Sequence, residues 1–191
     1  GSRCSLHEWE QLWQDLRGGN IAHAYLLAGR APKTKEDVIP YFVQSLLCTD
    51  PDQGLPCRVC TSCRAWEHRA HPDYHFLKPD GGSLKTEQIR LWRPFFQYSP
   101  QLGRHHLFLL ERPELLTPPA ANSLLKVLEE PLEQTVFLLV TEDERGILPT
   151  ILSRCRVVIF RPEAAARESG DNLDLEQAEE IARIIRAGKS S

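Results

Sequence analysis

The sequence predicts a three-layer α/β domain in which helices cover both faces of a parallel β-sheet. Short apolar runs, each suited to one buried strand, alternate along the chain with segments of helical periodicity. This alternation is typical of parallel strands joined by crossover helices. One strand-to-helix connection also has the residue spacing of a phosphate-binding P-loop, which indicates the P-loop type of α/β domain.

The expected elements follow one another in a regular order. The first helix has apolar residues at helical spacing from Trp9 to Leu16 and ends at Gly18. Strands are expected at residues 23–28, 74–77, 107–111, 135–141 and 156–160, and the later helices at 36–47, 86–97, 117–130 and 148–154. Residues 99–103 are an expected turn. Thr117 followed by Pro118 is a favourable helix start, because the hydroxyl can cap free N–H groups.

Composition and charge favour a globular protein over one that binds nucleic acid by bulk charge or spans a membrane. The chain has 191 residues, of which 41% are hydrophobic and 26% charged, enough for a buried core. A formal net charge of -3 argues against binding nucleic acid through bulk positive charge, although a local basic face is compatible with it. There is no signal-peptide pattern and no apolar run long enough to span a membrane. We therefore expect a cytoplasmic protein with no membrane partner.

Residues 29–36 keep the spacing of a P-loop but change the residues that its chemistry needs. A working loop uses glycines so that backbone N–H groups can wrap a phosphate, a lysine for the β- and γ-phosphates, and a hydroxyl for magnesium. Gly29 and Lys35 remain, whereas Thr34 replaces the second glycine and Glu36 replaces the hydroxyl. A β-branched residue is poorly tolerated at positive φ. A glycine and a lysine at this spacing also occur by chance, but the flanking strand and helix are the setting of a P-loop.

The end of the strand at 107–111 is where P-loop ATPases carry their Walker B carboxylates. Glu111 and Arg112 stand there, so the acidic pair is reduced to one acid and one base. A lone Glu111 is equally typical of a solvated strand end, and Arg112 would repel a metal. Two changes, one in each phosphate-site motif, predict a scaffold with no functional ATP site and no efficient hydrolysis, which needs positioned metal and water.

Four of the six cysteines lie within sixteen residues, at Cys48, Cys57, Cys60 and Cys63. Four thiolates at these spacings can close a tetrahedral zinc site. Such a site is structural, because four protein ligands leave no open position for catalysis.

Other interpretations of these cysteines stay open. Disulfides are less favoured, since nothing else indicates an oxidising compartment. An iron–sulfur cluster would need a fourth cysteine followed by proline, but Glu67 occupies the position four residues after the last cysteine. A histidine, His68, His71 or His75, can instead be the fourth ligand, which would leave Cys48 as a core thiol.

Four blocks of the sequence together resemble bacterial clamp-loader subunits of the AAA+ family. They are residues 21–27, the cysteine insert, the Asn-x-Leu-Leu-Lys-x-Leu-Glu-Glu-Pro block within 121–131, and the Ser-Arg-Cys sequence at 153–155. The resemblance implies an AAA+ domain at residues 3–161 with a zinc insert at 48–63. It also implies the start of a helical lid domain at 162–191, where residues 172–187 have the apolar spacing of one amphipathic helix. Because the family continues into a collar domain, the chain is expected to be a fragment or an unusually short homologue.

Within this family, gamma/tau subunits keep intact phosphate motifs, whereas delta-prime subunits have lost them and keep the zinc insert. The sequence therefore resembles the delta-prime branch, a part of the DNA polymerase III holoenzyme. The resemblance implies a non-hydrolysing stator that helps load the sliding clamp onto primed DNA. The implied partners are gamma/tau ATPase subunits, the delta subunit, the beta clamp and, through the assembled loader, primed DNA. No enzymatic activity is expected of the isolated chain.

The resemblance implies that Arg154, in the Ser-Arg-Cys sequence, is an arginine finger acting in trans, with Ser153 and Cys155 supporting it. Such an arginine reaches the γ-phosphate of ATP held by a neighbouring gamma/tau subunit. A guanidinium is permanently charged and its planar fork suits phosphate oxygens. Arg154 is therefore expected at the surface, with no buried carboxylate partner in its own chain. One alternative is an ATP-binding gamma/tau-like ATPase, and a more distant one is a zinc-dependent nucleic-acid-binding module.

Overall fold

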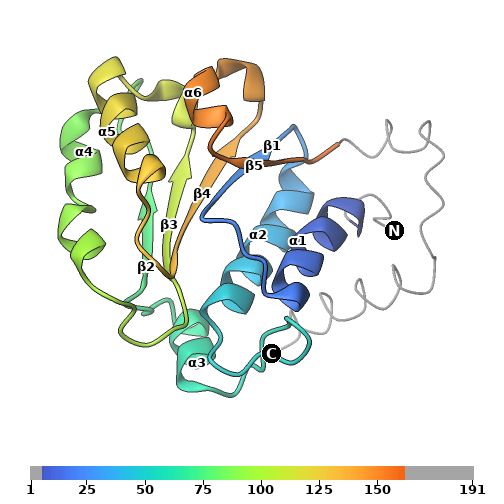
Figure 1. Cartoon of the computed structure of the whole chain (residues 1–191). Helices are drawn as coiled ribbons and strands as arrows, with labels where there is room; N and C mark the ends of the chain where they lie inside the picture. Colours follow the sequence, from blue (N-terminus) through green and yellow to red (C-terminus); the bar gives the residue numbers. More distant parts are fainter. Residues whose placement is uncertain (1–5, 162–191) are drawn as a thin grey trace.

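The computed structural model describes residues 6–161 and has a five-stranded parallel sheet at its centre (Figure 1). The strands are β1 (Ala24–Ala28), β2 (Tyr74–Leu77), β3 (His106–Glu111), β4 (Thr135–Thr141) and β5 (Arg156–Ile159). Their order across the sheet is β2-β3-β4-β1-β5, and every neighbouring pair is parallel. The predicted parallel α/β fold is confirmed.

Helices cover both faces of this sheet, which makes three layers (Figure 1). One face is covered by α1 (Leu6–Gly18) and α2 (Pro32–Leu47), and the other by α4 (Thr86–Arg90), α5 (Pro118–Glu129) and α6 (Pro149–Leu152). Alternate strand residues enter opposite layers: Leu107 of β3 packs toward α1 and α2, and Phe108 packs toward α4 and α5. Burial on both faces explains why β1, β3 and β4 are continuous apolar runs rather than alternating ones.

Four short elements complete the described chain. The helix α3 (Thr61–Glu67) lies beside the carboxyl end of α2, and η1 (Arg93–Gln97) follows α4. The 3-10 turns η2 (Pro113–Leu115) and η3 (Glu144–Gly146) follow β3 and β4. No helix within residues 6–161 is long and apolar enough to cross a membrane. The expected lid segment at 162–191 lies outside the described residues.

Two predicted helices differ from the observed ones for identifiable reasons. The helix expected at 36–47 begins four residues earlier, with Pro32 in its first turn, where the missing N–H of proline is not needed. The helix expected at 86–97 is broken into α4 and η1. Pro94 accounts for the break, because its ring has no N–H and collides with the carbonyl four residues before it. The cap predicted at Thr117 is present, since its hydroxyl accepts from the Ala120 amide.

Candidate functional site

The cysteine insert forms a compact cluster at the amino-terminal edge of the sheet, next to the end of α2. The sulfur atoms of Cys48, Cys57, Cys60 and Cys63 all lie within 4.8 Å of one another. Sulfurs bound at about 2.3 Å to one tetrahedral ion stand roughly 3.8 Å apart, and the Cys48 and Cys60 sulfurs are 4.0 Å apart. All four cysteines are free thiols rather than disulfides. The geometry therefore fits a four-sulfur metal site.

Backbone amides of the insert point at these sulfurs. The amide of Cys57 donates to the Cys48 sulfur, that of Cys60 to the Cys57 sulfur, and that of Cys63 to the Cys60 sulfur, each at 3.3 Å. The last bond makes Cys60 the N-cap of α3, a helix that was not predicted. Hydrogen bonds of this kind favour the thiolate, the form that binds a metal.

The thiols of Cys48, Cys60 and Cys63 differ in how readily they ionise. Burial raises the pKa of the Cys48 and Cys63 thiols. Burial also opposes ionisation of Cys60, but hydrogen bonds from Thr49 and from the Cys63 amide lower the pKa of that thiol to about 6. A bound cation would offset the cost of charging the buried pair, so the donor set suits a metal that prefers sulfur.

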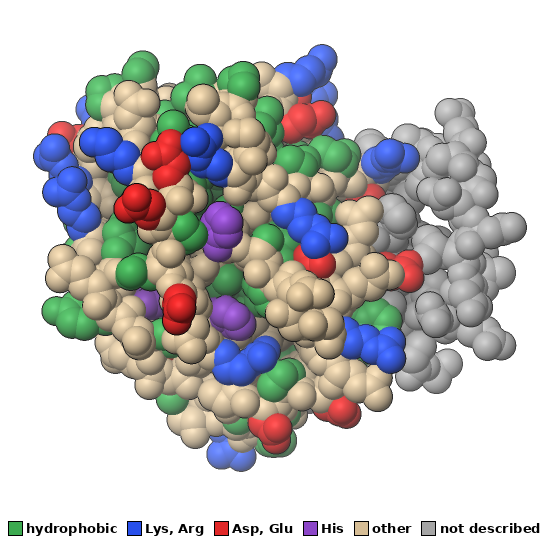
Figure 2. Space-filling view, viewed as in Figure 1, with side chains coloured by type: hydrophobic (Ala, Val, Ile, Leu, Met, Phe, Trp, Pro, Cys, Tyr) green, Lys and Arg blue, Asp and Glu red, His purple; other side chains and the backbone are tan. Residues whose placement is uncertain are grey.

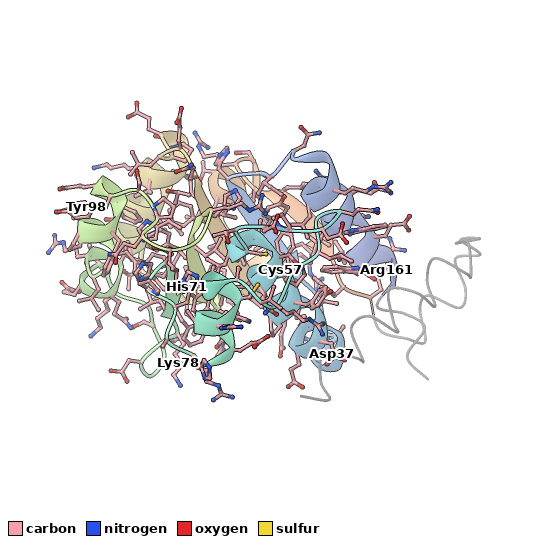
Figure 3. All side chains as sticks on the ribbon, turned by 90° about the horizontal axis from the view of Figure 1, so that it is seen from below. Asp37, Cys57, His71, Lys78, Tyr98 and Arg161 are labelled. Carbon is pink, nitrogen blue, oxygen red and sulfur yellow. The ribbon has the colours of Figure 1, made fainter. Side chains whose placement is uncertain are left out.

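His71 is buried against Ser62 of α3 and bonds to groups other than the cysteine sulfurs. Its Nδ1 accepts from the Asp73 amide at 3.1 Å, so Nε2 carries the proton and donates to the Ser62 hydroxyl at 2.8 Å. Ser62 in turn donates to the carbonyl of Leu47 at 2.7 Å. Figure 3 shows Cys57 near sulfur atoms between α2 and α3, with His71 on the far side of α3. The histidine is thus a support for the insert, and Cys48 rather than a histidine completes the cluster.

Asp73 anchors the same edge, and sequence reasoning missed it. Its buried carboxylate accepts from the amides of Gln101, Leu102 and Gly103 at 2.6 to 2.7 Å. These bonds fix the predicted turn before β3 to the start of β2. The acceptor and its donors are 28 to 30 residues apart, so no local pattern could have identified the pair.

At the opposite, carboxyl-terminal edge, the P-loop-like connection is shorter than a working loop. Only three residues separate β1 from α2, so Thr34, Lys35 and Glu36 lie inside the helix. Gly29 has φ +117°, and a Cβ added there would stand 2.0 Å from the carbonyl oxygen of Phe160. The conformation and the crowding both require glycine. Gly29 is therefore needed because the chain after β5 approaches it closely, and this requirement does not depend on phosphate binding.

The side chain of Lys35 is turned toward its own chain. Its ammonium donates to the backbone carbonyl of Thr141 at the end of β4. Burial lowers the pKa of Lys35, while the nearby carboxylates of Glu142 and Glu114 act in the opposite direction. Glu114 also accepts from the Thr141 hydroxyl at 2.9 Å. The lysine that would contact phosphate in a P-loop thus lies in an internal polar network.

A pocket of about 920 Å³ lies at this edge and is lined by both phosphate-site motifs. Its charged lining residues are three basic ones and four acidic ones: Arg30, Lys35, Arg112, Glu36, Glu111, Glu114 and Glu142. Arg112 adopts a left-handed conformation, with φ 54°, and its Nε lies 3.7 Å from the Glu114 carboxylate. The pocket therefore has no excess of positive charge to attract a triphosphate.

Arg154 lies away from that pocket, on the surface between α5 and α6. It precedes β5, whose first residue pairs with Tyr25 near the start of β1. About three strand residues, or roughly 10 Å, separate this end of β5 from the end level with Gly29. The Arg154 side chain is 32% exposed, and its Nη2 donates to Glu129, itself 45% exposed, at 2.9 Å. The prediction excluded a buried carboxylate partner, and Glu129 is an exposed one that the sequence did not indicate.

The two neighbours of Arg154 have different surroundings. Ser153 is exposed, and its hydroxyl lies 3.3 Å from the Arg154 Nη1 and donates to the carbonyl of Thr150. Cys155 is partly buried against the α5 and α6 layer, and burial raises the pKa of its thiol to about 11. Its thiol is therefore a packing group rather than a reactive one.

The described surface has no strong charge asymmetry on the face viewed in Figure 2. Acidic and basic side chains are interspersed there, with no broad field of one sign. This agrees with the formal net charge of -3 for the whole sequence and differs from the basic footprint of a protein that binds DNA by bulk charge.

The strand order and the paired motifs after β1 and β3 define an AAA+-type P-loop domain with altered phosphate-site residues. The family described as DNA polymerase III, delta subunit, matches residues 6–164, and the chain belongs to this family. It is 38% identical over 156 residues to DNA polymerase III subunit delta' of Pseudomonas aeruginosa, covering 80% of this chain and 48% of the relative. For the delta' subunit of Bacillus subtilis the identity is 34% over 151 residues, covering 79% and 46%.

The chain spans about half the length of these relatives. Among solved structures, a DNA polymerase III gamma subunit-related protein from Thermotoga maritima superposes with a TM-score of 0.58 at 26% identity, covering 80% of this chain and 45% of that one. The predicted resemblance to delta-prime subunits and the AAA+ fold are both confirmed.

Proposed function

We propose that this chain is the AAA+ part of a clamp-loader subunit that does not hydrolyse ATP and supplies Arg154 to ATP bound by a neighbouring subunit. In this role it helps load the sliding clamp onto primed DNA in the bacterial cytoplasm. Its partners are gamma/tau ATPase subunits, the delta subunit and the beta clamp, with primed DNA contacted through the assembled loader.

The observation that carries the proposal is the placement of Arg154 relative to the chain's own phosphate-site residues. Those residues follow the carboxyl ends of β1 and β3, whereas Arg154 precedes the opposite end of β5. An arginine so placed lies at the opposite edge of the sheet from its own pocket, which suits it to serve another subunit rather than its own phosphate site. Arginines supplied in trans raise phosphoryl-transfer rates by about 10³ to 10⁵ in related systems.

Three features of the carboxyl-terminal edge support the proposed lack of hydrolysis. Lys35 is bonded to Thr141, Glu36 replaces the magnesium-binding hydroxyl, and Arg112 stands where a second acid is needed. A triphosphate would therefore have to displace an internal bond of Lys35 and enter a pocket with more acids than bases.

Zinc is the metal proposed for the cysteine cluster, with a structural role. Sulfur-only donors and tetrahedral spacing suit Zn²⁺, and all four positions would be filled by protein. The ion would hold the loop before α3 to the end of α2. It would take no part in phosphate chemistry, because the cluster lies at the opposite edge of the sheet from the pocket.

The proposal is tested with the full-length subunit assembled into its loader. Arg154→Ala should slow clamp- and DNA-stimulated ATP hydrolysis about tenfold or more at the site it serves, and lysine should not restore the rate, since an ammonium lacks the planar fork. Arg145→Ala is the matched control, because Arg145 also forms an exposed ion pair, with Asp143 at 2.8 Å. Normal hydrolysis by the Arg154→Ala loader would refute the proposal.

A gamma/tau-like ATPase is the second candidate, favoured by the similarity to the gamma subunit-related structure. It requires magnesium-dependent ATP binding by the chain itself, which the proposed function excludes. A nucleic-acid-binding module would instead require salt-dependent DNA binding by the isolated chain.

A further inference from the structure

Arg154 is held from two sides by its own chain. Its Nη1 donates to the carbonyl of Thr150 at 2.8 Å and lies 3.3 Å from the hydroxyl of Ser153. Its Nη2 donates to the carboxylate of Glu129 at 2.9 Å, across from α6 to the end of α5. The Nη1 contacts come from residues within four positions of Arg154, so they hold one side of the guanidinium against its own turn. The Nη2 contact alone ties the guanidinium to another element.

The electrostatics of its helix disfavour Glu129 at its position. It is the last residue of α5, where the partial negative charge of the helix end disfavours a carboxylate. Local helix stability therefore gives no reason for an acid there. The ion pair with Arg154 offsets the unfavourable dipole and is the contact that the described structure offers for this side chain.

The ion pair between Arg154 and Glu129 is weak enough to be broken by a competing ligand. Both side chains are partly exposed, Arg154 at 32% and Glu129 at 45%, and exposed ion pairs shift an equilibrium by only about two- to fivefold. A carboxylate that stays on Nη2 would stand beside any phosphate bound to the same edge of the guanidinium, and the two negative groups would repel each other. Binding of a triphosphate to the Nη2 edge of Arg154 therefore requires Glu129 to leave.

We infer that Glu129 is a positioning residue that holds the Nη2 edge of Arg154 in its own chain until the triphosphate of a neighbouring subunit displaces it. This inference rests on the proposed trans role of Arg154. In the separate subunit the ion pair keeps the guanidinium folded against α5. In the assembled loader the phosphate replaces the carboxylate, while the contacts to Thr150 and Ser153 keep the Nη1 side of the guanidinium in place.

The test uses Glu129→Gln, which keeps the shape and removes the charge, with Glu130→Gln as the matched control. Glu130 is the adjacent exposed acid at the C-cap of α5. In the reconstituted loader, Glu129→Gln should raise ATP hydrolysis without clamp and DNA about two- to fivefold and leave the fully stimulated rate within twofold, so the stimulation ratio falls. Glu130→Gln should change neither rate.

A second readout on the soluble chain separates this role from a purely structural one. Nitrogen-15 NMR of the Arg154 guanidinium should show hindered rotation in the unmodified protein and in Glu130→Gln, and faster rotation in Glu129→Gln. Unchanged rotation and unchanged hydrolysis in Glu129→Gln would overturn the inference, as would a loss of stimulated activity equal to that of Arg154→Ala. If Arg154→Ala itself has no effect on the loader, the proposed function fails, and the inference fails with it.

Discussion

At the amino-terminal edge of the sheet, four sulfurs lie within 4.8 Å of one another and receive three backbone amide bonds. At the carboxyl-terminal edge, the lysine of a P-loop spacing donates to a carbonyl of its own chain. Both regions match a known motif in residue spacing. In the first, the donors required by the chemistry are present and converge, whereas in the second they are replaced or occupied.

The difference shows how far the spacing of motif residues along the sequence can predict a working site. The cysteine motif is local: sixteen residues contain every donor, and the backbone of the insert orients them. A phosphate site needs groups from a loop, a helix and two strands, so a single replaced residue can disable it. Retention of Gly29 and Lys35 therefore says little about phosphate, since both have other roles within the chain.

The largest expected effect would come from removing one ligand of the amino-terminal edge. Cys63→Ser should weaken metal binding by more than the roughly 10- to 100-fold that loss of an outer-shell partner costs. Amide hydrogen exchange should accelerate in residues 48–67 while β1, β3 and β4 keep their protection. Cys155→Ser, which changes a partly buried thiol outside the cluster, should leave the metal content unchanged.

Elemental analysis and exchange mass spectrometry measure both effects. Iron instead of zinc, or unfolding of the whole domain on chelation, would break the comparison, because the metal would then belong to the core rather than to the insert.

A smaller effect is expected at Gly29, which tests why the glycine is retained. Gly29→Ala should cost about 3 kcal/mol or more, because the added carbon meets the Phe160 carbonyl at 2.0 Å in addition to the strain of positive φ. Gly81→Ala is the control: its φ is +76° and nothing lies within 4 Å of the added carbon, so only about 1 to 2 kcal/mol is expected. Equal costs in denaturant unfolding would show that Gly29 has no packing role.

A still smaller effect is expected from acid at the amino-terminal edge, where protonation of His75 should lower the free energy of unfolding. His75 is stacked between Phe95 and Phe108, and its Nε2 lies 3.2 Å from that of His106. Burial, and then the charge of His106, lower the pKa of His75 to about 4, although the carboxylate of Asp73 acts in the opposite direction. In the unfolded chain the pKa of this residue is near 6.5, so between about pH 6.5 and 4 the unfolded chain binds a proton that the folded protein does not bind. The contribution of neutral His75 to the free energy of unfolding should be fully present above about pH 6.5 and should be lost as the pH falls toward 4.

The contribution of His75 to this loss should be about 1 to 2 kcal/mol, allowing for its partial exposure. His75→Gln should flatten the fall between pH 6.5 and 4, and exposed His68→Gln should leave it unchanged. Burial also lowers the pKa of His71, so some slope should remain. An identical pH profile of unfolding for His75→Gln and the parent would contradict this account.

Sequence patterns identified the parts of the fold that depend on local residues. The strands at 74–77 and 135–141 have the predicted bounds, because each is an apolar run between turn signals. The break at Pro94 was not predicted, although a proline inside a helical pattern is a local signal for one. The helix carrying Cys63 was hidden by its short length.

The parts that escaped prediction depend on residues distant in the chain. Asp73 bonds to amides 28 to 30 positions away, and Arg154 pairs with Glu129 across 25 positions. The bond of Lys35 to Thr141 spans 106 positions. Only the folded arrangement brings these groups together, so a motif could place Arg154 and Lys35 but could not reveal their partners.

The most direct test of the account is a calorimetric titration of the chain with ATP and magnesium, with a gamma/tau subunit as positive control. Because Lys35 is occupied and the pocket is lined by more acids than bases, we predict no saturable binding up to about 1 mM, a limit equivalent to roughly 4 kcal/mol. Magnesium-dependent binding at micromolar concentrations would contradict the claim that this edge has lost its nucleotide site.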